Sequence, residues 1–468
     1  MSSHGDLPPE LVEQLKSTGQ AHLVTVLEEL GPPARGALLN QLRQIDLEQL
    51  QRLQADPLSG TDPRELASEA TPPPAFRLDG RGARFTAEEA IARGEAALRG
   101  AKIGTILVAG GQGTRLGFPH PKGMYDLKLP SGRTLFQIFV DRILAVGKRY
   151  GVGIPLYLMT SPATHDETGA YFEQRDNLGL GDDLTIFCQG TMPAVDAVTG
   201  QLLLASPQSL ALSPDGHGGT LAALAKHGCL DNAQSRGIEQ LFYFQVDNPL
   251  SQICDPEFIG YHLLSESELT TQVVAKQRPE EKVGVAVQIG DEVRILEYSN
   301  LTEEATRRTD ETGGLALWAG NTAVHVFNLQ FLQRMVEQAG TLPYHRARKK
   351  VPYIDESGTL VETDEPNAIK FERFIFDLLP HAKNAVVVEV DPACGFAPVK
   401  NEPGAATDSP ETSRAAILAL HRRWLEAAGA DVAGDAEIEL GPTFALNQED
   451  VTRRIESGQG FAETAYLA

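Results

Sequence analysis

The sequence predicts an α/β protein built on a doubly wound, mostly parallel sheet, with an N-terminal helical domain and a small C-terminal module. Three observations indicate this fold class. Short apolar stretches alternate with helical patterns through the middle of the chain, a glycine-rich turn follows the first apolar stretch, and leucine-rich helical patterns precede it. We expect domain divisions at residues 1–90, 91–392 and 393–468.

Residues 9–55 are predicted to form helices. Leu23, Val26, Leu27 and Leu30 follow the three- and four-residue spacing of one buried helix face. A Gly-Pro-Pro sequence then separates the first helices from the next. We expect residues 57–84, which are rich in proline, to be a surface connector without a function of its own.

The central region begins with a short apolar strand at residues 103–108, followed by a helical pattern at 135–146. Further strands are predicted at residues 155–159, 241–246, 271–275, 284–289 and 385–389, and helices at 220–229, 256–265 and 328–337. Strands that alternate with helices are typical of a parallel sheet covered on both faces. From residue 412 a helix begins the C-terminal module, which then becomes irregular.

Composition limits the possible functions. The 468 residues carry 41 Lys and Arg against 63 Asp and Glu, a formal net charge of −22, which argues against broad nucleic-acid binding. No apolar run is long enough for a membrane span, and the N-terminus lacks a signal-peptide pattern. The four cysteines form no CxxC pair. We therefore expect a cytoplasmic protein that binds neither nucleic acid nor membrane; the sequence does not determine its oligomeric state.

The strongest local signal is the glycine-rich turn at residues 107–117. Such a turn after the first strand of an α/β sheet lets main-chain N–H groups approach an anion. It is not a Walker A loop, because no Gly-Lys-Ser/Thr follows. It also departs from the dinucleotide fingerprint, because position 116 is Leu where the third glycine is due. The turn is therefore predicted to hold phosphates of another kind of ligand.

Two cations lie close to this turn. Arg115 and Lys122 are seven residues apart, and two cations beside a glycine cradle suit a triphosphate whose pyrophosphate departs. The alternative is an ordinary strand-to-helix turn with solvated side chains. The combination of the turn, Arg115 and a Pro-Lys pair favours the phosphate site.

The block LVAGGQGTRLGFPHPKGMYDLKLPSGRTLFQI at residues 107–138 resembles the nucleotide-binding loop of eukaryotic-type UDP-sugar pyrophosphorylases, with the closest match in the UDP-N-acetylhexosamine (glucosamine and galactosamine) branch. The resemblance covers about residues 90 to 425 in one order. Its other blocks are QG at 189–190, SPDGHGG at 213–219, QVDN at 245–248, VGV at 283–285, LEYS at 296–299, AGN at 319–321, KKVPY at 349–353, PNAIKFE at 366–372, FD at 376–377 and FAPVKN at 396–401.

The resemblance implies a nucleotide-diphospho-sugar transferase fold and a uridylyltransferase. Such an enzyme joins UTP to a sugar 1-phosphate, here expected to be N-acetylglucosamine 1-phosphate, and releases pyrophosphate. The displacement at the α-phosphorus needs positioning and charge stabilisation rather than a covalent nucleophile. The implied partners are UTP and the sugar phosphate, and the implied cofactor is Mg²⁺ or Mn²⁺.

The family pattern also assigns the UTP-binding residues. Gln189 and the backbone at Gly216 match positions that read the uracil edge, and a side-chain amide suits uracil because it both donates and accepts. Arg115, Lys122 and Lys400 are the implied catalytic cations. The implied UTP-binding set is Ala109, Gly110, Gly111, Lys122, Gln189, Gly216, Asp247 and Lys370.

Asp247 follows an apolar strand, where ligands bind in open α/β sheets. The resemblance implies that it lies near the ribose and α-phosphate, and it is the candidate metal ligand because Mg²⁺ needs only one or two protein carboxylates beside phosphates and water. An Asx turn that closes the strand is the alternative.

The implied sugar-binding residues are His217, Glu297, Asn321 and Lys400. Glu297 and Asn321 match positions that hold sugar hydroxyls and the 2-substituent, and a solvent-facing strand carboxylate is the alternative for Glu297. Lys349 and Lys350 are expected to be a solvated pair rather than ligands.

One position departs from the acetylhexosamine pattern, because His217 stands where those enzymes carry Asn. The Gly-His-Gly version resembles the UDP-glucose and broad-specificity branches, so glucose 1-phosphate is the alternative substrate. A nucleotide-sugar sensor without turnover is a further alternative. An NAD-linked oxidoreductase is disfavoured by Leu116.

Overall fold

The computed structural model describes residues 7–55, 63–338, 342–355 and 357–468. The chain forms two compact units, each built from three separate segments. Unit 1 contains residues 1–62, 189–219 and 340–377, and unit 2 contains residues 63–188, 220–339 and 378–468. The expected divisions after residues 90 and 392 remain predictions.

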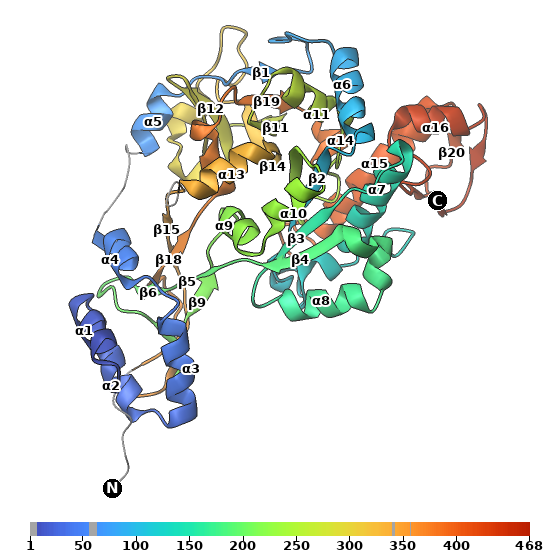
Figure 1. Cartoon of the computed structure of the whole chain (residues 1–468). Coiled ribbons are helices and arrows are strands. Elements are labelled where there is room, and N and C mark those ends of the chain that lie inside the picture. The colour runs from blue at the N-terminus through green and yellow to red at the C-terminus, as the bar shows by residue number, and fades with distance from the viewer. Residues whose placement is uncertain (1–6, 56–62, 339–341, 356) are drawn as a thin grey trace. The chain divides into compact units, whose positions relative to one another are not determined.

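The core of unit 2 is a mixed sheet with one long path of strands (Figure 1). Along this path β14 is antiparallel to both of its neighbours, whereas the other neighbouring pairs are parallel. The antiparallel hairpin of β12 (Val285–Ile289) and β13 (Glu292–Leu296) attaches to β14. The order along the path is β1 (Ala75–Phe76), β19 (Val386–Glu389), β11 (Leu269–Ala275), β14 (Ala319–Asn328), β10 (Gln240–Gln245), β2 (Ile103–Val108), β3 (Leu156–Thr160) and β4 (Leu184–Cys188).

This strand order is doubly wound. From β2 the chain moves outward through β3 to β4, and it then returns to place β10 on the other side of β2. The direction of winding therefore changes between β2 and β10. In open α/β sheets, ligands bind outside the carboxyl ends of the strands at such a switch point. The predicted fold class, a doubly wound and mostly parallel sheet, is confirmed.

Helices cover both faces of this sheet because neighbouring strand residues point to opposite sides. Leu156 and Leu158 of β3 belong to the buried cluster formed with α6 (Ala87–Arg99), α7 (Leu135–Tyr150) and α11 (Pro256–Leu264). Tyr157, between them, points to the other face, where its hydroxyl donates a 2.8 Å hydrogen bond to Asn232 of α10 (Cys229–Ser235).

Most predicted elements of unit 2 lie within a few residues of the observed ones. The helix predicted at residues 220–229 is instead α9 (Gly219–Lys226) followed by α10, with Gly228 between them in the left-handed region at φ 68°. The helix predicted at 328–337 is α13 (Leu329–Glu337), capped by Asn328. Strands β4 and β14 were not predicted. β14 begins Ala-Gly-Asn-Thr and lacks a regular alternation of apolar and polar residues.

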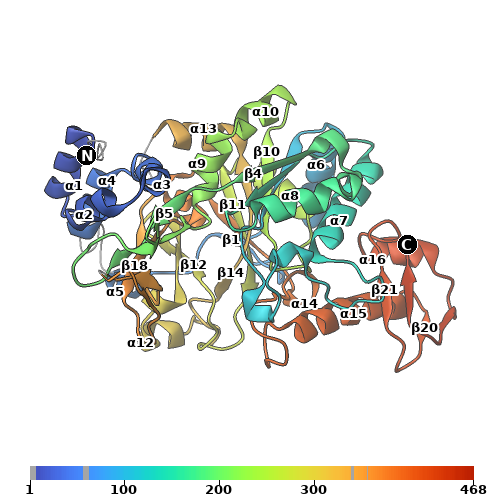
Figure 2. The same ribbon diagram turned by 90° about the horizontal axis from the view of Figure 1, so that it is seen from below.

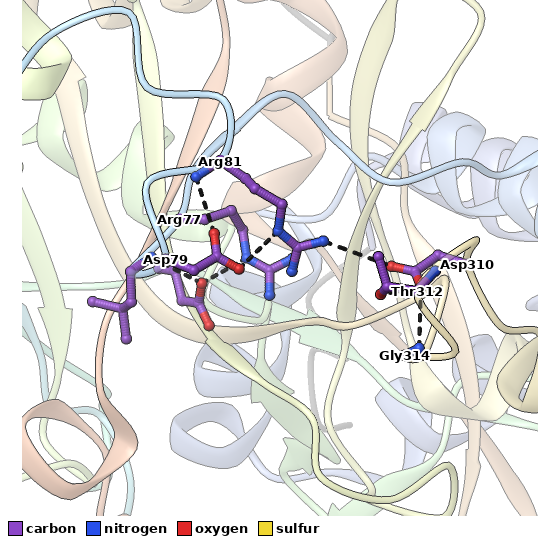
Figure 3. A network of polar contacts seen from close by, with 8 residues as sticks. Arg77, Asp79, Arg81, Asp310, Thr312 and Gly314 are labelled. Atoms are coloured by element: carbon purple, nitrogen blue, oxygen red, sulfur yellow. Dashed lines mark hydrogen bonds and ion pairs between the residues drawn. The ribbon is translucent and has the colours of Figure 1, made fainter.

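The predicted connector contains elements of the fold. Its described residues include α5 (Pro63–Glu69) and the edge strand β1, which pairs in parallel with β19. Arg77 Nε pairs with Glu389 Oε2 at 2.6 Å, and the Arg77 guanidinium lies 3.5 Å from the centre of the Trp318 ring. Figure 3 shows the neighbouring network, in which Arg81 pairs with Asp79 at 2.7 Å and approaches Asp310 at 4.0 Å. The expectation of a simple surface loop was therefore wrong.

The C-terminal part of unit 2 begins with α15 (Pro410–Ala427), as predicted from residue 412 onward. The following residues are more regular than expected. They form α16 (Gln448–Arg454) and two short parallel pairs, in which β20 (Asp431–Val432) pairs with β22 (Gly460–Phe461) and β21 (Ile438–Leu440) with β23 (Ala465–Leu467). Figure 2 shows α15 and α16 beside β20 and β21 near the C-terminus. Leu425 of α15 packs with Ile438, Leu440 and Val451 in one apolar cluster.

Unit 1 combines the predicted N-terminal helices with two later segments of the chain. Leu23 and Leu27 are buried in one cluster with Val195, Ile369 and Phe371, so the helices cover strands from both later segments. The helices are α1 (Pro9–Ser17), α2 (His22–Glu29), α3 (Pro32–Leu42) and α4 (Leu47–Ala55), and the three-stranded sheet is β15 (His345–Lys349), β18 (Ala368–Glu372) and β6 (Val195–Asp196).

Within the described ranges, the protein has no helix that is both long enough and apolar enough to cross a membrane.

Candidate functional site

The glycine-rich turn leaves the carboxyl end of β2 and is closed by its own main chain. Ala109 N donates to the carbonyl of Met159 at 2.8 Å, which joins the start of the turn to β3. Farther along, Gly113 N donates to His120 O at 2.8 Å and Lys122 N donates to Gly111 O at 3.0 Å. These bonds fold residues 109–122 back on themselves. Lys122 is thereby placed beside the glycines, as the sequence predicted.

One glycine of this turn, Gly113, and one shortly after it, Gly123, are required by close packing, whereas Gly111 faces open space. A Cβ at Gly123 would lie 2.2 Å from the ring of Phe136, and one at Gly113 would lie 2.7 Å from Phe118 O. At Gly111 a Cβ would meet no atom within 4 Å. Gly111 therefore lines an unfilled side of the turn, where the main chain can approach a ligand closely.

Ser161 supports the turn and was missed by the sequence analysis. Its hydroxyl donates a 2.7 Å hydrogen bond to the carbonyl of Gly110, and the residue is only 1 % exposed. Its main-chain N–H in turn donates to Thr164 Oγ1 at 3.1 Å. A Ser directly after the end of a strand has no distinctive sequence pattern, so only the hydrogen bond identifies it.

Four predicted charged residues lie near one another at the switch point. Asp247 follows β10, and its Oδ2 lies 3.9 Å from Nζ of Lys400. Burial lowers the pKa of the Lys122 ammonium; Asp247 opposes this effect, whereas the positive charges of Arg115 and Lys400 add to it. The four side chains therefore act on one another electrostatically. Such a site, with more positive than negative charge, suits a polyanionic ligand.

The position of Lys400 depends on residues that follow β10. The side chain of Asn248, 2 % exposed, donates to Gly395 O at 2.9 Å and accepts from Ala397 N at 3.0 Å. Val399 N then donates to Asp247 O at 2.7 Å. These bonds hold the segment before Lys400 against the end of β10. Asn248 is the last residue of the Gln-Val-Asp-Asn block at 245–248, but from this block the sequence predicted a role only for Asp247.

Glu297 and Asn321 each lie near Gly284, in another part of unit 2. Asn321 N donates to Gly284 O at 2.8 Å, and a Cβ at Gly284 would lie 3.1 Å from Glu297 Oε1. Asn321 Oδ1 accepts from Ala323 N at 2.9 Å, at a bulge where β14 shifts register against β11. Asn321 itself stays paired with Val273 of β11, so the extra residues of the bulge lie between Asn321 and His325. Both residues thus lie around Gly284, and their joint role in binding a sugar stays a prediction.

Unit 1 contains the remaining predicted residues, namely Gln189, Gly216, His217 and Lys370. Gly216 has φ 84°, and a Cβ there would lie 2.4 Å from Arg373 O, so no other residue fits without a shift. Gly218 N donates to the same carbonyl at 2.7 Å, and Asp215 forms an ion pair with Arg373. The glycine-containing loop is thereby fastened to the segment that follows β18, the strand carrying Lys370.

His217 has a structural environment of its own. Its Nδ1 accepts the N–H of Ile375 at 3.2 Å, and its ring stacks on Phe374 with the centroids 5.3 Å apart. Burial lowers the pKa of His217 to about 4, and His345 adds to this effect. The ring is therefore neutral near pH 7. Its predicted contact with the sugar stays a prediction.

Gln189 is 8 % exposed, whereas Lys349 and Lys350 are exposed, as expected for a solvated pair.

Few side chains could bind a metal ion together in the part of the chain that the structure describes. No group of three or more His, Cys, Asp or Glu side chains there is arranged to hold a metal ion. Asp247 offers a half-buried carboxylate, and its 3.9 Å separation from Lys400 is longer than a hydrogen bond. This geometry fits a Mg²⁺ that takes its other ligands from phosphates and water.

The fold and this charged turn define a doubly wound α/β protein with a mainly positive group of side chains at its switch point. Comparison with known proteins makes the assignment specific: the family described as UTP–glucose-1-phosphate uridylyltransferase matches residues 84–423. The chain belongs to this family. The resemblance found in the sequence is thereby confirmed.

Similar proteins cover most of the chain. A mouse protein named UDP-N-acetylhexosamine pyrophosphorylase-like protein 1 is 38% identical over 433 residues, covering 89% of this chain and 85% of its own. The UDP-N-acetylglucosamine pyrophosphorylase of Saccharomyces cerevisiae is 39% identical over 374 residues, covering 78% and 77%. The crystal structure of the uridine diphosphate N-acetylglucosamine pyrophosphorylase from Trypanosoma brucei matches with a TM-score of 0.81 at 27% identity, covering 96% of this chain and 95% of that one.

Proposed function

We propose that the protein is a uridylyltransferase that joins UTP to N-acetylglucosamine 1-phosphate and releases pyrophosphate. Membership in the family and the names of the relatives support this reaction. The structural observation that carries the proposal is the meeting of Arg115, Lys122, Lys400 and Asp247 beside the switch point between β2 and β10. A triphosphate needs this kind of positive site when its pyrophosphate leaves.

The proposed reaction is an in-line displacement. A phosphate oxygen of the sugar 1-phosphate attacks the α-phosphorus of UTP, the bond from that phosphorus to the bridging oxygen breaks, and pyrophosphate leaves with the electron pair. Main-chain N–H groups of the turn at Gly110 and Gly111 would hold phosphate oxygens, and Arg115 would stabilise the charge on the leaving group. Lys122 and Lys400 would orient the two phosphates for attack.

Mg²⁺ (or Mn²⁺) is part of the proposal. Asp247 would hold it, and the bound ion would neutralise phosphate charge as it develops. The ribose and α-phosphate would lie near the same residue. We also propose that Gln189 and Gly216 read the uracil, that Lys370 binds phosphate, and that the reaction takes place in the cytoplasm.

The proposal also names which sugar 1-phosphate is the substrate. Glu297 and Asn321 would bind its hydroxyls and its 2-substituent, because a carboxylate accepts hydrogen bonds and an amide both donates and accepts them. His217 favours a second candidate, glucose 1-phosphate, because it replaces the asparagine of the acetylhexosamine pattern. Relatives named for N-acetylglucosamine favour the acetylated sugar.

A panel of sugar 1-phosphates tests the function directly. The purified protein is incubated with UTP, Mg²⁺ and each of the glucose, galactose, N-acetylglucosamine and N-acetylgalactosamine 1-phosphates, and pyrophosphate release is measured. We expect the highest kcat/KM with N-acetylglucosamine 1-phosphate. Highest activity with glucose 1-phosphate would select the second candidate. Binding of UTP without pyrophosphate release from any sugar would indicate a nucleotide-sugar sensor instead.

A further inference from the structure

A cavity of about 70 Å³ lies within unit 2 and is lined by residues other than those of the switch point. Three parts of the chain surround it, namely α7, the residues that follow β10, and α15 with the segment after it. From α15 it is lined by Ile417, Leu420, His421 and Trp424, which follow the spacing of one helix face. A space of this size holds several water molecules, or one small ion in their place.

Two polar groups that line this cavity have no hydrogen-bond partner in the described parts of the chain. Ser251 is 2 % exposed, and its Oγ is buried without a partner. The Nε of Arg142 is also buried and unpartnered. A buried polar group left without a partner costs about 1–3 kcal/mol. Native proteins therefore rarely keep such groups unless a bound water or ligand satisfies them.

Arg142 is a cation of this cavity that has no carboxylate of its own. Its guanidinium donates to Gln252 Oε1, and it forms no ion pair with any residue that the structure describes. Burial lowers the pKa of Arg142 to about 10, and Asp255 opposes this effect, so the side chain stays charged near pH 7. A buried charge is costly unless it is paired. The unpartnered Nε therefore favours an anion as the occupant of the cavity.

The two carboxylates that line the cavity already have partners. Arg133 Nε pairs with Asp141 Oδ2 at 2.8 Å. Glu439 accepts hydrogen bonds from the main-chain N–H and the hydroxyl of Ser131, at 2.7 and 2.8 Å. Neither carboxylate is bonded to Arg142, so the positive charge of this side chain remains available to a ligand.

His421 supplies a third donor. Its Nδ1 accepts the N–H of Leu440 at 3.1 Å, so the neutral ring carries its proton on Nε2. Burial lowers the pKa of His421 to about 4, and Arg142 adds to this effect. The ring is therefore neutral near pH 7 and lines the cavity with an N–H to donate.

We propose that this cavity binds a small tetrahedral oxyanion, free phosphate or sulfate, through Nε of Arg142, Oγ of Ser251 and Nε2 of His421. These donors come from three parts of the chain, and a tetrahedral ion offers oxygens in several directions. A carboxylate such as acetate has only two oxygens, in one plane. A hydrogen bond between a guanidinium and an anion is also roughly twice as strong as a neutral one. The site does not depend on the proposed uridylyltransferase function, because its residues are outside the proposed catalytic set.

Trp424 can report on the cavity directly. The chain has two tryptophans, so in a Trp318→Phe background all tryptophan emission comes from the one that lines the cavity. Titration with sulfate or phosphate, at an ionic strength held constant with chloride, should change this emission saturably. Acetate should need about tenfold higher concentrations, the equivalent of one charged hydrogen bond. The absence of a saturable change, or equally tight binding of acetate, would overturn the proposal.

Variants show which residues bind the ion. Ser251→Ala removes only a hydroxyl without a partner, so it should raise the half-saturating sulfate concentration by about tenfold while the free energy of unfolding does not fall. Arg142→Met should abolish the saturable change. Lys122→Met is the matched control, because it removes a cation of the switch point and should leave the Trp424 titration unchanged. Loss of the response in Lys122→Met together with an unchanged response in Ser251→Ala would place the ion at the switch point and overturn the proposal.

A crystal of the full-length wild-type protein soaked in selenate locates the ion without any substitution. Selenate has the shape and charge of sulfate, and the anomalous scattering of selenium marks its position. We expect an anomalous peak inside the cavity beside Arg142 and Ser251. A cavity that holds only water in such a crystal would overturn the proposal.

Discussion

The ammonium of Lys122 donates a 3.0 Å hydrogen bond to the main-chain carbonyl of Val399. Lys122 belongs to the turn after β2, and Val399 immediately precedes Lys400, so this bond joins two segments that are far apart in the sequence. Val399 also donates its N–H to Asp247 O at 2.7 Å. The main chain of Val399, a residue with an apolar side chain, thereby links Lys122, Asp247 and Lys400.

The first prediction concerns the charge of Lys122. Burial lowers its pKa from the usual 10.5, and Asp247 partly opposes this effect. Because the proposed role needs the ammonium, kcat/KM for UTP should fall as pH rises through this lowered pKa, which lies below 10.5. In Lys122→Arg the alkaline decline should disappear from the measured range, since arginine stays charged. A pH profile from 7 to 10.5 tests both statements, and an identical decline in the arginine variant would assign it to another group.

The second prediction concerns Arg115 and the leaving group. Arg115→Ala should lower kcat by about 10²–10³-fold, as removal of one charge-stabilising donor does in other enzymes. The KM for UTP should rise much less, because the charge develops mainly in the transition state. Arg93→Ala, at an exposed position of α6, serves as the control for loss of an arginine. A near-normal kcat in Arg115→Ala would remove this residue from the mechanism.

The third prediction concerns the metal. Activity should be lost in EDTA and restored by Mg²⁺, because the proposed site supplies one carboxylate for an ion that also needs phosphate oxygens. Asp247→Asn should raise the Mg²⁺ concentration needed for half-maximal activity by about tenfold or more, as loss of a ligand or its support does at metal sites. The unfolding midpoint of this variant is measured alongside. Full turnover in chelator would contradict the metal assignment.

The fourth prediction separates packing from binding in the glycine-rich turn. Gly123→Ala should destabilise the protein by about 1–3 kcal/mol, because its Cβ would lie 2.2 Å from the buried ring of Phe136. Gly111→Ala should leave the free energy of unfolding nearly unchanged, because its Cβ meets no atom within 4 Å. It should nevertheless raise the KM for UTP. Equal unfolding free energies for the two variants, measured in urea, would contradict the packing difference.

The fifth prediction concerns the pH dependence of stability at His217. Its pKa is about 4 in the folded protein, against 6.5 for an ordinary histidine, so the unfolded state takes up a proton first as pH falls. The resulting contribution is present above pH 6.5 and is lost as pH falls towards 4. Between these values the wild-type protein should lose about 1–3 kcal/mol more stability than His217→Asn. Parallel urea-unfolding curves at pH 6.5 and 4.5 measure this difference, and equal losses would place His217 in a solvated setting.

The same variant tests the contact with the sugar. If position 217 also touches the sugar, His217→Asn should shift the ratio of kcat/KM for N-acetylglucosamine 1-phosphate over glucose 1-phosphate upward by about five- to thirty-fold, the equivalent of one hydrogen bond. An unchanged ratio would leave His217 as a residue that holds the loop to Ile375 and Phe374.

Local patterns in the sequence determined the fold class and the chemical character of the candidate site. Apolar strands such as residues 103–108 and amphipathic helices such as 135–150 depend on side-chain periodicity, which is visible without any tertiary contact. The glycine-rich turn with Arg115 and Lys122 is likewise local, because one short segment supplies both the main-chain donors and the cations. Strand β14 lacked such periodicity because most of its residues are buried, and a strand covered on both faces needs no alternation of apolar and polar residues.

Only the tertiary structure decided which distant residues act on one another. The Asp247–Lys400 pair joins segments 153 positions apart in the numbering (400 − 247), and no local pattern specifies its 3.9 Å distance. Asn248 and Ser161 act through side-chain hydrogen bonds to the main chain of other segments, so their residue types alone gave no signal. The edge strand β1, in the segment that was predicted to be a connector, also depends on a tertiary contact. Residues 75–76 are too few for a periodic pattern, and they form a strand because β19 offers them a free edge.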